Sequence, residues 1–569
     1  MKKLYLPGTF TLLFYFTILA NTSAQTGDLG SYQITVFADR PVGKFQPIWR
    51  FFGYDEPNYS YMPEGKQLLD EISRLKPQPV FIRTHHLLTS GDGTAWLKWG
   101  STGAYDEDQQ GNPIYNWNIM DEIFDSFILR GLKPLVEIGF MPKALSIKPD
   151  PYTNPVVTNG PPLDAVGRGW AYPPKDYDKW QKLIEEWVKH SLRRYGTNEV
   201  LSWYWELWNE PNIAYWRGTP IEYQKLYDYT AAAVKNVLPQ ARIGGPHTAG
   251  TQGGAEKFLR SFIEHCLYGT NYVSGKKGTP LDFIAFHAKG GTEFRDGHVR
   301  MNAGNHLRII ENGFKIMSSY PELKGIPVII GESDPDGCAA CSARFFPQNN
   351  YRNTSQYASY TAATFMRKIA LARRYGVNLI GAVTWAFEFE NQPWFDGLRV
   401  LSTRGVPLPV FNAFRMFSLL EPEQVQTQNS TQENLDIILK NSVRGEKPDV
   451  DAFATRGSNR VAVLVWNYHD DGIPAKEEQV KLNIQGLNVK LNSARLRHYR
   501  IDEHHSNAYT LWKEFGSPQN PTQEQIALLK RASELTALHP ERSVELKNGS
   551  LTIEFPMPRQ SVSLIAIEW

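Results

Sequence analysis

The chain has 569 residues, of which 41% are hydrophobic and 21% charged, and its formal net charge is +2. This length exceeds what one hydrophobic core usually covers, so we expect two folded domains, or one large domain with an appendage. The basic residues are dispersed, which argues against a nucleic-acid or anionic-membrane surface and favours a small or uncharged partner.

The first 24 residues have the layout of a secretory signal peptide. Lys2 and Lys3 precede an apolar stretch over residues 10–20, and Ala24 ends a small-residue cleavage site. An uncleaved membrane anchor is the alternative, but the apolar stretch is shorter than the ~20 residues that span a bilayer. We therefore expect a secreted or periplasmic protein with no membrane contact after signal cleavage.

Residues 46–415 alternate short apolar runs with amphipathic helical patterns. Residues 178–195, for example, keep apolar side chains at helical spacing, and Gly196 supplies a stop. Eight runs read as strands; they begin at Pro47, Pro79, Lys133, Leu201, Ala241, Leu281, Ile326 and Asn378. The pattern predicts an α/β domain, a (β/α)8 TIM barrel. A doubly wound sheet is the main competitor, but no strand is followed by a Gly-rich phosphate loop.

Residues 416–569 have a different pattern of short alternating strands separated by turn residues. We predict a β-sandwich with strands from Val461, from Leu551 and at the C-terminus. A helical insertion is expected over residues 523–538. Residues 25–45 include an alternating stretch from Ser31, which we expect to add a strand to the same sheet.

The cysteine content excludes a disulfide scaffold, because the chain has three cysteines. Cys338 and Cys341 form a CxxC motif, and a zinc site would need two more ligands at suitable spacing, which are not evident. In an exported protein a local disulfide is favoured. Cys266 is then expected to be a free, buried thiol, and we expect no metal or other cofactor.

Polar side chains cluster where the predicted barrel strands end. Reactive residues of a (β/α)8 barrel lie at the carboxyl ends of its strands, so these side chains are the candidate site. They are His85, His86, Asn209, Glu210, His247, His287, Lys289, Glu332, Trp385 and Glu388. Glu210 and Glu332, after the fourth and seventh strands, can face one central pocket.

Two facing carboxyl groups are what glycoside hydrolysis requires. One carboxyl donates a proton to the departing oxygen, and the other, kept ionised, attacks the anomeric carbon. The tryptophans of the segment WYWELWNEPN predict an apolar setting for Glu210, the expected acid. Glu332 is the expected nucleophile, and the two groups should lie about 5–5.5 Å apart, the spacing of a retaining enzyme. Structural salt bridges at the barrel rim are the alternative for each glutamate.

Other strand-end residues are predicted to bind the sugar. Asn209 is placed to contact a hydroxyl next to the anomeric carbon, and Trp385 and Trp394 to stack on a sugar face. His85 and His287 are further candidates. The alternative is that the histidines are hydrogen-bonded rim residues and the tryptophans core residues.

Several motifs together resemble glycoside hydrolase family 39 of clan A, which holds β-xylosidases and α-L-iduronidases. The motifs are WNEPN, KPLVEIGFMPKAL, ARIGGP and YRIDEHHSNAYTLWKEFGSP, and the resemblance covers nearly the whole mature chain. It implies a retaining mechanism with Glu210 as acid/base and Glu332 as nucleophile. It also implies a barrel followed by a sandwich domain.

Within that family, some stretches resemble the iduronidases. They are IRTHHLL, HCLYGTNYVSG, FHAKGG and GESDP. The third contains Lys289, which matches a lysine that contacts the substrate carboxylate in iduronidases, whereas xylosidases typically carry Tyr there. The segment EFENQPWFDGLRVLSTRG does not reproduce the carboxylate-binding loop of iduronidases. The alternative for Lys289 is an ion pair with a protein acid such as Glu332 or Glu388.

The leading hypothesis is a retaining exo-glycosidase, β-xylosidase-like, that acts on an oligosaccharide or polysaccharide. An α-L-iduronidase-like or α-L-arabinofuranosidase activity on polysaccharide is the second. A non-catalytic carbohydrate-binding protein is the alternative of another class, and the presence of both carboxylates counts against it. No nucleic-acid partner is expected.

Overall fold

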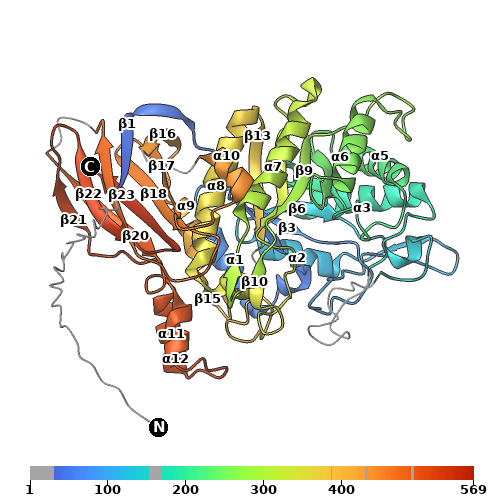
Figure 1. Ribbon diagram of the computed structural model, residues 1–569. Coiled ribbons are helices and arrows are strands. Elements are labelled where there is room, and N and C mark those ends of the chain that lie inside the picture. The colour runs from blue at the N-terminus through green and yellow to red at the C-terminus, as the bar shows by residue number, and fades with distance from the viewer. Residues whose placement is uncertain (1–30, 55, 153–168, 386, 430–433, 488–491) are drawn as a thin grey trace, which may run out of the picture.

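The computed structural model describes residues 31–569 except 55, 153–168, 386, 430–433 and 488–491. The predicted signal peptide lies outside the described residues. The chain forms two units, a barrel and a separate sheet, which lie side by side in Figure 1. In the described part of the chain, no helix is long and apolar enough to cross a membrane.

The predicted barrel is confirmed, and its strands are the eight predicted ones. All neighbouring strands are parallel, and β13 pairs with β2 to close the barrel. In spatial order the strands are β2 (Phe51–Tyr54), β3 (Phe81–Thr84), β6 (Lys133–Ile138), β7 (Tyr204–Leu207), β8 (Arg242–Thr248), β9 (Phe283–Lys289), β12 (Pro327–Asp334) and β13 (Asn378–Trp385).

Amphipathic helices cover the outside of the barrel. In α3 the side chain of Asp176 accepts hydrogen bonds from the first turn, and Gly196 ends the helix at a φ of 82°. The helices are α1 (Pro63–Ser73), α2 (Asn118–Ile128), α3 (Tyr177–Tyr195), α4 (Thr197–Leu201), α5 (Pro220–Val237), α6 (Gly254–Tyr268), α7 (Ala303–Ser318), α8 (Ser355–Tyr375) and α9 (Pro409–Phe417).

The loops between these strands and helices contain short hairpins and 3-10 helices. The hairpins pair β4 (Tyr105–Glu107) with β5 (Pro113–Tyr115), β10 (Glu293–Arg295) with β11 (His298–Arg300), and β14 (Ser402–Thr403) with β15 (Val406–Pro407). The short 3-10 helices are Pro57–Tyr59, Lys143–Leu145, Pro321–Leu323 and Pro347–Asn353.

The second unit is a mostly antiparallel sheet of nine strands. Its spatial order is β21 (Arg542–Glu545), β20 (Ser493–Ile501), β23 (Ser561–Glu568), β18 (Arg460–Tyr468), β17 (Asp449–Arg456), β16 (Glu423–Asn429), β1 (Tyr32–Lys44), β19 (Glu478–Gln485) and β22 (Leu551–Met557). β22 lies at one end of this order, yet Arg500 of β20 donates to the carbonyl of Pro556. The sheet therefore folds over into two layers, a β-sandwich with its own apolar core.

The predicted helical insertion in the sandwich differs in extent. The structure has α11 (Ala508–Glu514), which the sequence patterns did not indicate, and α12 (Gln523–Ala532), which ends before the predicted Leu538. The helix stops because the following segment turns back to β20, where the N–H of Leu538 donates to the carbonyl of His498. A further short helix, α10 (Leu435–Asn441), packs against α7.

Helix α8 lies between the two units. It packs on β13 of the barrel and on β18 and β23 of the sandwich, so most of its residues are buried. Arg367 of α8 pairs with Asp449 of β17 at 2.6 Å, and both side chains are buried. The side chain of Gln356 donates to the carbonyl of Asp470.

Candidate active site

Glu210 and Glu332 meet at the carboxyl end of the barrel. Glu332 belongs to β12, and Glu210 follows β7 in a left-handed conformation with a φ of 48°. One oxygen of each carboxyl group lies within 4.8 Å of the other and of a ring nitrogen of His287. This is close to the spacing of a double displacement, whereas inverting enzymes hold their carboxyl groups about 6.5–9.5 Å apart.

Glu332 is surrounded by cationic and hydrogen-bonding groups. Lys289 Nζ lies 2.6 Å from Oε2, and His85 Nε2 and Arg83 Nη1 lie 3.2 and 3.4 Å from Oε1. Burial alone would raise the pKa of Glu332, but the charge of Lys289 and the interactions with His287 and His85 outweigh it and hold this pKa well below the usual range. Glu332 is therefore ionised at neutral pH, as a nucleophile must be.

Arg83 of β3 is the centre of the buried charge network beneath this pair. Its Nε donates to Glu206 at 2.6 Å and its Nη2 to Glu137 at 2.9 Å, and all three side chains are fully buried. The same Nη2 donates to Asn209 Oδ1 at 3.1 Å, which orients that amide. Sequence reasoning missed Arg83, Glu137 and Glu206. Their signal was a charged residue in the middle of an apolar strand, which must be paired when buried.

The surroundings of Glu210 differ from the apolar setting that we predicted. Trp203 stacks on Phe124 and Trp205 packs against Trp187, so both rings face the helices outside the barrel. Successive side chains of a strand point to opposite faces, which explains why Trp205 faces the helices while the next residue, Glu206, points into the barrel. The partner of Glu210 is instead His287, whose Nδ1 lies 2.9 Å from Oε1.

Lys289 pairs with Glu332 and not with Glu388. A second acid, Asp334, lies 3.9 Å from Lys289 Nζ. Glu388 is buried elsewhere, where it accepts hydrogen bonds from the hydroxyl of Ser402 and the N–H of Gly405. Burial raises the pKa of Glu388 to about 8.

The two predicted stacking tryptophans lie in different places. The ring of Trp385, at the end of β13, packs edge-on to His85 at 4.9 Å, with Lys289 Nζ 5.7 Å from its centre. Trp385 therefore borders the site. Trp394 is buried in the following loop, where its backbone N–H donates to the side-chain oxygen of Gln519, in the sandwich insertion, at 3.0 Å. Its predicted sugar contact stays a prediction.

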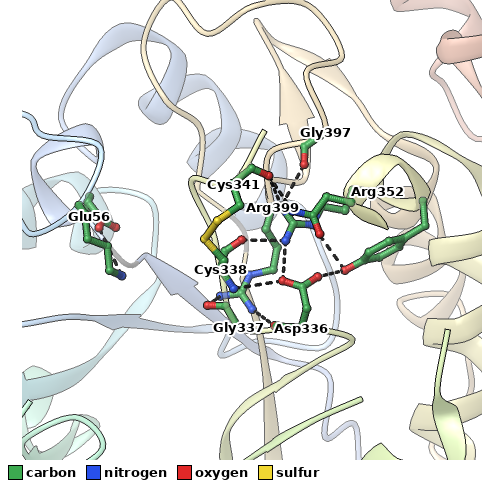
Figure 2. The surroundings of a disulfide bond; sticks show 11 residues. Glu56, Asp336, Gly337, Cys338, Cys341, Arg352, Gly397 and Arg399 are labelled. Atoms are coloured by element: carbon green, nitrogen blue, oxygen red, sulfur yellow. Dashed lines mark hydrogen bonds and ion pairs between the residues drawn. A yellow bond between two sulfur atoms is a disulfide. The ribbon is translucent and has the colours of Figure 1, made fainter. Parts of the chain in front are cut away.

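The predicted disulfide is present in the loop after β12, and Cys266 is a buried free thiol. Figure 2 shows Arg352 beside the bridge, where it donates to the carbonyls of Cys338 and Gly397 and pairs with Asp336. Arg399 donates to the carbonyl of Asp336. Arg399 also lies 3.6 Å from Asp334, the second acid near Lys289. Arg399 therefore links the disulfide loop to the acids beside Lys289.

A separate cavity of about 980 Å³ lies where the sandwich meets the barrel loops. Tyr351, Arg500 and His505 are among its lining residues, and neither Glu210 nor Glu332 is. Its volume alone gives no evidence of catalysis, because the paired carboxyl groups lie elsewhere.

The chain matches known proteins over most of its length. The model of the glycosyl hydrolases family 39 matches residues 32–546. A beta-xylosidase from Caldicellulosiruptor saccharolyticus is 27% identical over 455 residues, 79% of this chain and 82% of that protein. An alpha-L-iduronidase from Mus musculus is 22% identical over 420 residues, 68% of this chain and 62% of that protein.

A solved structure shows the same fold. The GH39 enzyme from Xanthomonas axonopodis pv. citri has a TM-score of 0.73 at 20% identity, over 95% of this chain and 97% of that chain. The family match spans both barrel and sandwich, and the carboxyl pair stands at the barrel mouth. The chain therefore belongs to the glycosyl hydrolases of family 39 and is a retaining glycoside hydrolase.

Proposed function

We propose that the protein is an exported exo-glycosidase that releases a neutral pentose, as a β-xylosidase does, from the end of an oligosaccharide or polysaccharide. The ion pair of Lys289 carries this proposal. Its ammonium already contacts Glu332 at 2.6 Å and lies near Asp334, so its charge is balanced within the protein. A substrate carboxylate would have to compete with the nucleophile for the same cation, whereas a neutral sugar would not.

The mechanism assigns one role to each carboxyl group. Ionised Glu332 attacks the anomeric carbon and forms a covalent glycosyl-enzyme, while Glu210 donates its proton to the departing oxygen. Glu210, now a carboxylate, then takes a proton from the water that releases the sugar. Arg83 holds Oδ1 of Asn209, so Nδ2 is the amide group that would donate to the sugar hydroxyl beside the anomeric carbon.

The substrate is tested with a panel of nitrophenyl glycosides. We expect kcat/KM to be highest on the β-D-xyloside and lower on the α-L-arabinofuranoside, with no turnover of the α-L-iduronide. Preferential turnover of the iduronide would contradict the proposal. The observation that favours an iduronidase-like activity is the exposed fraction of the Lys289 side chain, 21%, which leaves its ammonium within reach of a bound sugar.

Two alanine variants test the roles. Glu332→Ala should abolish turnover of every substrate, because a nucleophile is needed whatever the leaving group. Glu210→Ala should spare activated aryl glycosides and be partly rescued by azide, because a general acid matters only when the leaving oxygen must be protonated. Identical behaviour of the two variants on an activated aryl glycoside would contradict the assignment.

Export is part of the same proposal and rests on the N-terminal sequence. N-terminal sequencing of the protein recovered from the periplasm or medium of an expressing bacterium should begin at Gln25. An intact Met1 on the active protein would contradict cleavage.

A further inference from the structure

A file of buried side chains leads from Glu210 into the barrel. Glu210 Oε1 lies 2.9 Å from His287 Nδ1, and His287 Nε2 lies 3.3 Å from His247 Nδ1. His247 Nε2 in turn contacts Glu206 Oε2. Among the described residues neither of these last two atoms has another hydrogen-bond partner, and the three inner side chains are fully buried or nearly so.

The file can be hydrogen-bonded in two directions. A neutral histidine donates from one ring nitrogen and accepts at the other. If Glu206 is ionised, both histidines carry hydrogen on Nε2, and His287 Nδ1 accepts a hydrogen bond from protonated Glu210. If Glu206 is protonated, both carry hydrogen on Nδ1, and His287 donates to ionised Glu210. Glu210 is therefore protonated when Glu206 is ionised, and ionised when Glu206 is protonated.

The local charges favour an extra proton in this network. Three buried carboxyl groups, those of Glu137, Glu206 and Glu332, contact Arg83, and Lys289 and His85 lie beside Glu332. Burial lowers the pKa of His247 and of His287, so these two rings are neutral and add no positive charge beside the carboxyl groups. Burial raises the pKa of Glu206 well above its usual range, against the opposing charge of Arg83.

The groups that face each end of the file come from several strands. Glu206 is faced by Arg83 of β3, His85 directly after β3, Glu137 of β6 and His247 of β8. Glu210 is faced by His287 of β9 and Glu332 of β12.

We propose that His287 and His247 connect the acid/base Glu210 to Glu206 as a proton relay, so that the two carboxyl groups share one proton. The transfer is balanced: Glu210 gives its proton to His287 Nδ1, His287 Nε2 gives one to His247 Nδ1, and His247 Nε2 gives one to Glu206 Oε2. Both histidines are neutral before and after, and one proton has moved inward.

The inference rests on the proposed role of Glu210 and deepens it. Glu210 must be an acid in the first step and a base in the second. When the proton is on Glu210, His287 Nδ1 accepts a hydrogen bond from it. When the proton is on Glu206, His287 Nδ1 carries hydrogen and donates to the Glu210 carboxylate. Glu206 and His247 touch no reacting atom, so they are positioning residues.

The variant Glu206→Gln tests the relay, because Arg83 determines how the new amide is oriented. Arg83 Nε donates at the Oε1 position, which requires the amide oxygen there, so the NH2 group faces His247. The relay is then locked in the direction that donates to Glu210 and stabilises its carboxylate. We expect the basic limb of the kcat/KM profile to move to lower pH by about one unit or more. Glycosides with poor leaving groups should lose more activity than activated aryl glycosides.

Glu137→Gln is the control for charge, because it removes another buried carboxylate beside Arg83 that lies outside the file. Equal shifts of the basic limb in the two variants would overturn the relay, since a general change of charge would then explain both. Failure of the proposed function is recognised separately, by the absence of leaving-group dependence and azide rescue in Glu210→Ala.

Neutron diffraction from deuterated crystals provides a readout that does not depend on turnover. In the wild type each histidine should carry one ring deuterium, and the two should point in the same direction along the file. In Glu206→Gln both should lie on Nδ1. Histidines that point in opposite directions, or that carry two deuteriums, would overturn the proposal even if Glu206→Gln fails to fold.

Discussion

The ammonium of Lys289 is the cation that most directly holds the nucleophile ionised. Since it contacts Glu332 at 2.6 Å, Lys289→Met should raise the pKa of Glu332 and lower kcat on every substrate by about tenfold or more. The acid limb of the pH profile should move to higher pH. Steady-state kinetics on the xyloside at several pH values measure both effects.

Lys289→Arg is the control for this variant, because it keeps a positive charge at the same strand end. It should retain more activity than Lys289→Met on neutral glycosides. A rise of KM for uronic acid glycosides, with kcat on neutral glycosides unchanged, would instead identify Lys289 as a substrate contact.

Glu388 makes the stability of the protein dependent on pH. Burial raises its pKa from the ordinary 4.5 to about 8, so the folded state binds its proton more tightly than the unfolded state does. This contribution to stability is complete below about pH 4.5 and is lost as the pH rises toward 8. Glu388→Gln should therefore lose less stability than the wild type between pH 5 and pH 8. Urea denaturation at several pH values measures this, and parallel curves would contradict it.

Three barrel strands each carry a charged residue in an apolar run. In β3, β6 and β7 the residues Arg83, Glu137 and Glu206 lie among apolar residues and point into the barrel, while Trp205 of β7 faces the helices. Strand periodicity predicts which residues share a face. It does not predict that three separate strands place opposite charges in contact, because that depends on how the barrel closes.

Both hydrogen bonds and a disulfide stabilise the loop after β12. The bridge closes a loop of sequence separation 3, for which the chain-entropy model gives about 2 kcal/mol. Replacing both Cys338 and Cys341 by serine should lower the free energy of unfolding by about that amount or less. Activity should be retained, because Arg352 still holds the backbone of the loop.

Urea denaturation and kcat/KM of the double serine variant measure the two quantities. A reducing agent should lower the free energy of unfolding of the wild type to a value near that of the variant, and should leave that of the variant unchanged. Loss of activity on reduction, with stability unchanged, would show that the bridge itself positions the site.

The barrel and the sandwich are joined through a buried ion pair. Arg367→Met leaves Asp449, and Asp451 at 3.9 Å, without their cation and should cost about 3–5 kcal/mol of unfolding free energy. Adding Asp449→Asn should recover part of this loss, since the amide keeps an acceptor for the indole N–H of Trp466. A double-mutant cycle by urea denaturation tests the pair, and a cost below about 1 kcal/mol for Arg367→Met would show that it is not buried in solution.

Local patterns in the sequence determined the architecture of the molecule and the general location of its site. The eight apolar runs in the sequence correspond to the eight barrel strands. They could be predicted because the spacing of apolar residues that marks a strand or a helix lies within one short segment. The rule that parallel strands end at one face then placed Glu210, Glu332 and His287 together. The end of α12 was less predictable, since pairing with β20 competes with the helical pattern there.

Only the tertiary structure decided the electrostatics of the site. Barrel closure brings β3 against β6 and β9 against β12, so Arg83 meets Glu137, and Lys289 meets Glu332 instead of Glu388. These two contacts join residues that are 54 and 43 positions apart, and their geometry follows from strand order and register. No local period encodes that register, which is why the charge partners became known only from the folded barrel.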